Sequence, residues 1–115
     1  MIKTYEEALQ KLNDIRDYLK IARADECVEE LDSVAKYFIN ERNQPTLEEL
    51  IKEWEDDGFK FEKIFCYQLI NAKDDTEIYF NNDQRGLWCN IIGLLSSKQL
   101  IRLILTFVAL GWEVN

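Results

Sequence analysis

The stretch PTLEELIKEWEDDGFKF, residues 45–61, predicts a complete α-helix followed at once by a strand. Thr46 is a suitable N-cap, because its hydroxyl can accept a hydrogen bond from a backbone N–H of the first turn. Glu49, three residues later, gives the spacing of a capping box. We expect this linking helix to divide a helical N-terminal part of the chain from a mixed C-terminal part.

The end of the linking helix is predicted at Gly58. Glycine adopts the left-handed conformation that closes many helices, and this turn lets Phe59 fold back onto Trp54. The apolar residues before it recur at helical spacing and predict one buried stripe. They are Leu47, Leu50, Ile51 and Trp54.

The N-terminal part predicts two amphipathic helices, roughly residues 4–23 and 25–41, folded as a hairpin. Thr4 and Glu7 have capping-box spacing, and the apolar pattern slips in phase near Asp25, a suitable N-cap. One long bent helix is the alternative. The first helix would bury Tyr5, Ala8, Leu12, Ile15, Leu19 and Ala22.

Beyond the linking helix, three β-rich runs joined by short polar turns predict an antiparallel sheet. The first run is apolar on both faces, so we expect it to be central or covered on both sides. The runs span residues 61–70, 76–81 and 87–92.

The last predicted helix has signals at both ends. Ser96 and Gln99 form a third capping-box pattern. Gly111 is the expected stop, after which Trp112 can return onto Phe107. The broad apolar surface of this helix must lie against the sheet.

The predicted fold class is therefore α+β: an N-terminal helical hairpin, a linking helix, a three-stranded antiparallel sheet and a C-terminal helix packed on the sheet. The chain has 115 residues, of which 47% are hydrophobic, which suits one domain with its own core. Residues 1–43 form the hairpin unit and residues 44–115 an α-β-β-β-α unit. We expect the two units to pack as one compact domain.

Negative charge is concentrated on the linking helix and its exit. The chain carries 22 acidic and 14 basic residues, a net charge of −8, and seven of the acids fall within residues 44–63. Such a domain repels nucleic acid and favours basic partners, although the same charge also keeps a small protein soluble. The candidate partner-binding residues are Glu48, Glu49, Glu53, Glu55, Asp56 and Asp57, with Glu29 and Glu30 on the preceding helix.

Several kinds of active site are excluded or disfavoured. The chain has no histidine, which removes the commonest general base and metal ligand. Ser96 and Ser97 are explained by capping, and no glycine-rich phosphate loop is present. We predict no enzymatic activity, no cofactor and no metal. The alternative is a metal-dependent hydrolase that uses clustered aspartates, drawn from Asp56, Asp57, Asp74, Asp75 and Asp83.

The expected location is the bacterial cytoplasm. The N-terminus has no apolar signal core, and the longest apolar run is too short to span a bilayer. The three cysteines, Cys27, Cys66 and Cys89, have neither disulfide-framework nor zinc-site spacing.

From Pro45 onward the chain resembles small uncharacterised proteins of phages and prophages of Gram-positive bacteria. The resemblance rests on PTLEELIKEWEDDGF, the short sheet and the closing ALGW at residues 109–112. In size, charge and implied origin the chain is similar to anti-defence inhibitors, including anti-CRISPR proteins that block the nucleic-acid channel of an RNA-guided nuclease. The resemblance implies a protein-binding inhibitor and carries over no catalytic residue.

Other functions remain open. One is a regulatory or accessory phage protein that forms a homodimer through its N-terminal hairpin. Another is a weak single-strand binder, with Lys60, Lys63, Lys73 and Arg85 near Phe61, Phe65 and Trp88 on the sheet. If the acids prove inert, the next candidate surface is an aromatic edge around Trp54, Phe59 and Trp88.

Overall fold

The computed structural model describes residues 2–20, 28–83, 86–112 and 114. In chain order the elements are α1 (Tyr5–Asp14), the 3₁₀ helix η1 (Tyr18–Lys20), α2 (Val28–Arg42), α3 (Leu47–Asp56), β1 (Lys60–Lys63), β2 (Tyr67–Asn71), β3 (Thr76–Asp83), β4 (Gly86–Ile92) and α4 (Ser97–Ala109). The fold is α+β, as predicted.

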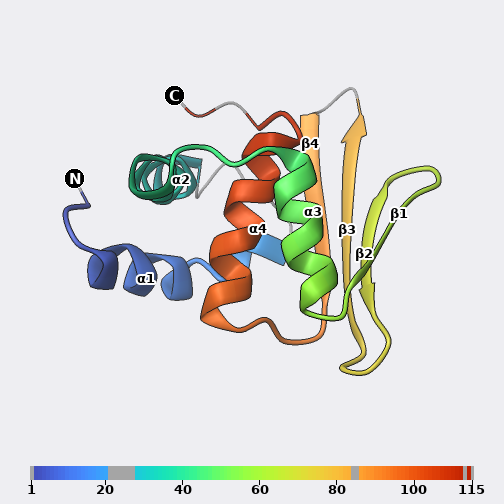
Figure 1. The fold of residues 1–115 in the computed structure, drawn as a ribbon. Helices are drawn as coiled ribbons and strands as arrows, with labels where there is room; N and C mark the ends of the chain where they lie inside the picture. Colours follow the sequence, from blue (N-terminus) through green and yellow to red (C-terminus); the bar gives the residue numbers. More distant parts are fainter. Residues whose placement is uncertain (1, 21–27, 84–85, 113, 115) are drawn as a thin grey trace.

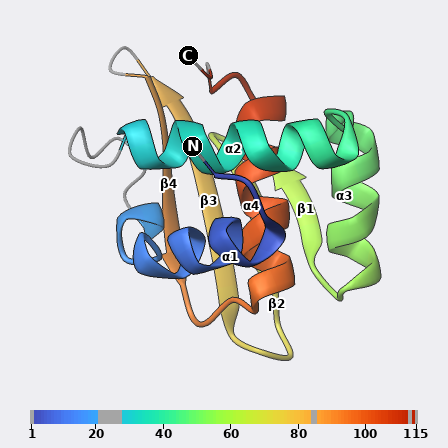
Figure 2. The same cartoon turned by 90° about the vertical axis from the view of Figure 1, so that its left-hand side faces the viewer.

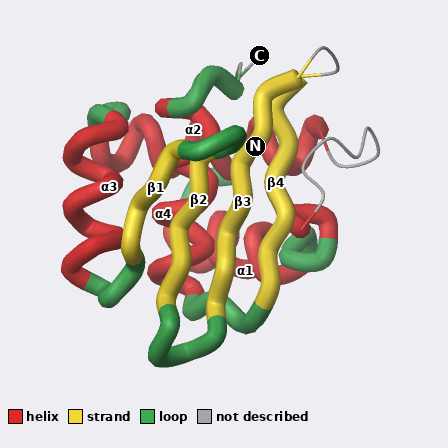
Figure 3. Tube along the Cα trace, turned by 90° about the vertical axis from the view of Figure 1, so that its right-hand side faces the viewer, coloured by secondary structure: helices red, strands yellow, loops and turns green. Residues whose placement is uncertain are grey.

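The elements form layers (Figure 1). The strands pair antiparallel in the order β1-β2-β3-β4, so the sheet is a simple meander. Helices α3 and α4 lie side by side against one face of the sheet, and α1 and α2 pack on the far side of α4. Figure 3 shows the opposite face of the sheet, which no described helix covers. We call it the open face.

The sheet has four strands rather than the predicted three. The run 61–70 is not one strand but parts of two, β1 and β2, joined by a hairpin at residues 64–66. The expectation that this run is central holds only for its second half, because β2 lies between β1 and β3 whereas β1 lies at the edge of the sheet. The hairpin contains none of the usual turn residues, so no local pattern predicted it.

The N-terminal part forms two separate helices rather than one long bent helix. Figure 2 shows α1 and α2 antiparallel and side by side. The first helix is shorter than predicted: α1 ends at Asp14, and the chain continues into η1. Ile15 and Leu19 are nevertheless buried, so the apolar pattern continued where the helix did not. The predicted N-cap Asp25 lies outside the described residues.

The predicted N-caps Thr4, Thr46 and Ser96 are confirmed. Ser96 and Gln99 form a complete capping box, with N–H···O distances of 3.2 Å to the serine Oγ and 2.8 Å to the glutamine Oε1. At the start of α3, the N–H of Glu49 donates to Thr46 Oγ1 at 3.2 Å. The Glu49 carboxylate accepts from the Thr46 hydroxyl instead of the backbone N–H, so this box is only half formed.

Two helix C-termini close as expected. At the end of α3, Gly58 has a φ of 93°, and the Phe59 N–H donates to the Trp54 carbonyl at 3.0 Å. The rings of Phe59 and Trp54 pack edge to face, with their centroids 4.9 Å apart. In α4 the Trp112 N–H donates to the Phe107 carbonyl at 2.9 Å. These side chains are thereby folded back into the core.

One polar cluster joins α3 to α4 inside the core. The Trp54 side chain is fully buried, and its Nε1–H donates to Thr106 Oγ1 at 3.0 Å. The Thr106 hydroxyl donates in turn to the Arg102 carbonyl at 2.7 Å. The Arg102 guanidinium lies 4.8 Å from the centre of the Trp54 ring and pairs with Asp57 at 2.5 Å. The sheet also packs on α4: the ring centroids of Phe80 in β3 and Phe107 in α4 are 5.3 Å apart.

The Trp54–Thr106 bond makes a testable contribution to stability. We expect Thr106→Val to lower the free energy of unfolding by about 1–3 kcal/mol, because the buried indole N–H loses its acceptor. In a Trp54→Phe background the same change should cost clearly less, since phenylalanine has no N–H to leave unpaired. Urea denaturation of the four proteins measures both costs. Equal costs in the two backgrounds would contradict the role given to this bond.

Candidate protein-interaction surface

Half of the six acids on α3 and its exit are used by the fold. Asp57 pairs with Arg102 of α4, and Glu53 pairs with Arg42 at the end of α2. Glu49 caps α3 through Thr46. These three residues already make contacts within the fold, so they are less available to bind a partner.

The other three acids form a free row. Glu55 and Asp56 lie seven and eight residues after Glu48, so all three side chains project from the same side of the helix. They are exposed, and no side-chain ion pair or hydrogen bond joins them to another described residue. The exposed Lys52 lies between them. We call Glu48, Glu55 and Asp56 the acidic stripe.

The acids predicted on α2 do not extend this stripe. Glu29 and Glu30 lie in the first turn of α2, whereas α3 lies beside the other end of that helix (Figure 2). Glu29 is exposed and Glu30 half-buried. Their neighbour Asp32 is buried and accepts from Trp112 Nε1 at 3.2 Å. The eight candidate residues therefore lie on two separate surfaces, and none of them is buried.

The open face of the sheet carries mixed side chains. Leu69 points into the core, so its strand neighbours Gln68 and Ile70 point the other way, opposite Tyr79 and Glu77 of β3. Desolvation, followed by the hydrogen bond to Glu77, raises the pKa of Tyr79 above its usual value. These four side chains are half-buried, and Glu77 is the one charged group among them.

The predicted basic–aromatic patch does not form on this face. Lys60 is paired with Glu62 at 2.9 Å. Lys63 lies over the Tyr67 ring at 4.9 Å, on the strand side that faces the helices. Arg85 is outside the described residues. The aromatic edge expected around Trp54, Phe59 and Trp88 is also wrong as a surface, because Trp54 and Phe59 are buried.

Phe65, the most exposed large apolar side chain among the described residues, lies at the β1–β2 turn, which sequence reasoning missed. Phe65 is 97% exposed and Ile64 63% exposed. The Ile64 N–H donates to the Cys66 carbonyl at 3.2 Å, and Cys66 Sγ accepts from the Gln68 amide at 3.9 Å. We call residues 64–66 the apolar tip. Figure 1 shows it projecting away from the helices.

No catalytic geometry is apparent in the part of the chain that the structure describes. Among those residues, no three metal-ligating side chains converge. Asp74 contacts Asn71 Nδ2 at 3.4 Å, and Asp57 is paired as described. Cys89 is buried, and burial raises its thiol pKa far above the usual range, so it is not a ready nucleophile.

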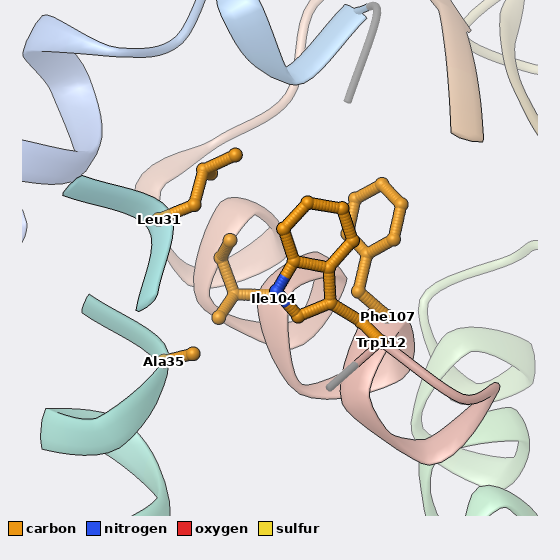
Figure 4. Close-up of a pocket in the computed structure, with 5 residues that line it drawn as sticks. All are labelled: Leu31, Ala35, Ile104, Phe107 and Trp112. Atoms are coloured by element: carbon orange, nitrogen blue, oxygen red, sulfur yellow. The ribbon is translucent and has the colours of Figure 1, made fainter. Parts of the chain in front are cut away.

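Two hollows lie beside α2 in the described part of the chain. One lies between α2, α4 and Trp112, and Figure 4 shows five side chains around it: Leu31, Ala35, Ile104, Phe107 and Trp112. Its volume of about 10 Å³ holds at most one water. A cleft of about 480 Å³ between the N-terminal segment and α2 is lined by Ile2, Ser33, Lys36, Tyr37 and Asn40. The Ser33 hydroxyl in this cleft donates to the Glu29 carbonyl at 2.9 Å rather than to a side chain that could act as a general base.

No protein-family model, curated protein or solved structure matches the chain. Among the described residues, none of the helices has the length and apolar character needed to cross a bilayer. The choice of function therefore depends on the surface itself.

The two partners of the Asp57–Arg102 ion pair differ in burial, so we expect their removal to cost different amounts of stability. The Arg102 side chain is 4% exposed and that of Asp57 is 35% exposed. Asp57→Asn leaves an uncompensated buried charge and should lower the free energy of unfolding by about 3 kcal/mol. Arg102→Met leaves a carboxylate that water can reach, so we expect a cost of about 1 kcal/mol.

Chemical denaturation of the two variants and their double variant checks this order. The double variant should be more stable than Asp57→Asn alone, because it removes the buried charge. A larger cost for Arg102→Met than for Asp57→Asn would contradict the argument.

Proposed function

We propose that this protein is a non-enzymatic inhibitor that binds a basic, nucleic-acid-binding protein. An RNA-guided nuclease of the CRISPR type is the leading candidate, which would make the protein an anti-CRISPR. The observation that carries the proposal is the acidic stripe. Its three carboxylates stay unpaired in a fold that neutralises or caps the neighbouring Glu49, Glu53 and Asp57.

The geometry of α3 supports recognition of lysine and arginine. The stripe is presented on a helix that is capped at its start, closed at its end and anchored by the buried Trp54. A rigid row of carboxylates resembles a row of phosphates and can compete for the same basic groups. Charge on this scale also speeds association, which suits an inhibitor that must act before its target does.

Direct binding of nucleic acid is less well supported. The net charge is −8, and the free acids face solvent. On the open face the described base Lys60 is already paired with Glu62, so it offers little to a phosphate. A protein partner with a basic surface fits these charges better. The part of the proposal that names a host defence system as the target rests on the resemblance to phage proteins.

The stripe can be tested with Glu48→Gln, Glu55→Gln and Asp56→Asn combined. At roughly 0.5 kcal/mol for each exposed pair, we expect binding to a guide-loaded nuclease to weaken about tenfold at low salt. The dependence of affinity on salt should also become shallower. Biolayer interferometry against a panel of purified guide-loaded nucleases, together with DNA cleavage assays, provides the measurement.

A matched control removes three exposed acids elsewhere: Glu6→Gln, Asp17→Asn and Glu41→Gln. It changes the net charge by the same amount but leaves α3 intact, so affinity should fall clearly less. Equal losses in the two triple variants would show that only net charge matters. Unchanged affinity and salt dependence in the α3 variant would reject the stripe as the binding surface.

A further inference from the structure

We propose that the apolar tip is the hydrophobic anchor with which this protein docks into an apolar socket on its basic protein partner. The inference rests on the proposed function and adds a second, uncharged contact to it. Its residues Ile64 and Phe65 are not part of the acidic stripe, and the basic–aromatic patch that was expected to include Phe65 does not form.

The composition of the tip is unusual for a turn. The Lys63–Tyr67 pair is closed by three residues, Ile64, Phe65 and Cys66, with no glycine, proline, asparagine or aspartate among them. The next turn of the same sheet follows the ordinary rule, since Asp75 there adopts a φ of 52°. The requirements of a hairpin turn therefore do not explain the apolar residues at positions 64–66.

The tip residues are also not used by the core. Phe65 is 97% exposed, whereas Phe59 and Phe80 are almost completely buried. Large apolar side chains left in water at a projecting point are typical of binding contacts. Aromatic side chains in particular dominate the binding energy when a partner buries them.

Contacts within the turn and its stem constrain the backbone of the tip. The Ile64 N–H bonds to the Cys66 carbonyl, and the Gln68 amide contacts Cys66 Sγ. Below the turn, the rings of Phe61 and Tyr67 stack across the two strands at 5.7 Å. A preorganised anchor loses less conformational entropy on binding than a flexible one.

The surroundings of the hairpin indicate the partner. Helix α3, which carries the acidic stripe, packs beside β1 at the edge of the sheet where the hairpin lies (Figures 1 and 3). A partner that receives the tip would place lysine or arginine against the stripe. A second copy of this chain would place like charges there instead, at a net charge of −8 for each copy. The occupant is therefore a basic protein with an apolar socket.

The test compares Phe65→Ala with Leu94→Ala. Leu94 is 84% exposed but lies at the opposite end of the sheet, after β4, and so controls for the general loss of an exposed apolar side chain. The probe is any guide-loaded nuclease that the wild-type protein inhibits. We expect Phe65→Ala to weaken binding about tenfold, mainly through faster dissociation, and Leu94→Ala less than about threefold. Thermal melting should be unchanged in both.

Further variants separate the anchor from the stripe and from folding. Phe65→Leu keeps an apolar side chain and should retain binding within about threefold. The salt dependence of binding should stay the same in Phe65→Ala, because no charge is removed. Such a result, with the loss confined to Phe65→Ala, supports the anchor.

Two outcomes overturn it in distinguishable ways. If the wild-type protein inhibits a nuclease and Phe65→Ala inhibits it equally well, or no worse than Leu94→Ala, the anchor is rejected and the proposed function stands. If the wild-type protein binds no nuclease in the panel, the proposed function fails and the anchor fails with it.

Discussion

The buried contact between Trp54 and Arg102 holds the two central helices together. The guanidinium lies over the indole ring, pairs with Asp57 and has no hydrogen-bond partner for its Nε among the described residues. A cation in the core needs a counter-ion, so α3 must end where the Asp57 carboxylate can reach the Arg102 guanidinium. The Asp57 carbonyl also accepts from Asn71 at 3.2 Å, which ties the same helix end to the sheet.

This requirement changes the meaning of the acidic composition. Asp57 and Asp56 are neighbours in sequence, yet one neutralises a buried arginine and the other faces water. Glu53 likewise balances Arg42. A count of charges treats these residues alike, whereas the fold leaves only part of the acidic helix free for a partner. The surface that can be recognised is therefore smaller and more specific than the composition suggests.

Local signals allowed much of the fold to be predicted, because helix ends depend on a few neighbouring residues. Gly58 and Ser96 are such cases. Contacts between distant residues left no comparable signal: Arg102 and Asp57 are 45 positions apart. The β1–β2 turn was missed because Phe65 is not a turn residue. Of the candidate site, the free part of α3 was included in the prediction, but the apolar tip was not.

Helix α4 follows all four strands in the chain, and it contacts α1, α2 and α3. Through Phe107 it also packs on the sheet. The three helices before it therefore lack their common packing surface until α4 has left the ribosome. The meander is built from pairs of strands that are adjacent in sequence, so its strands can pair early, but the core closes only when α4 is added. A chain released early, without α4, would offer proteases and chaperones an open core.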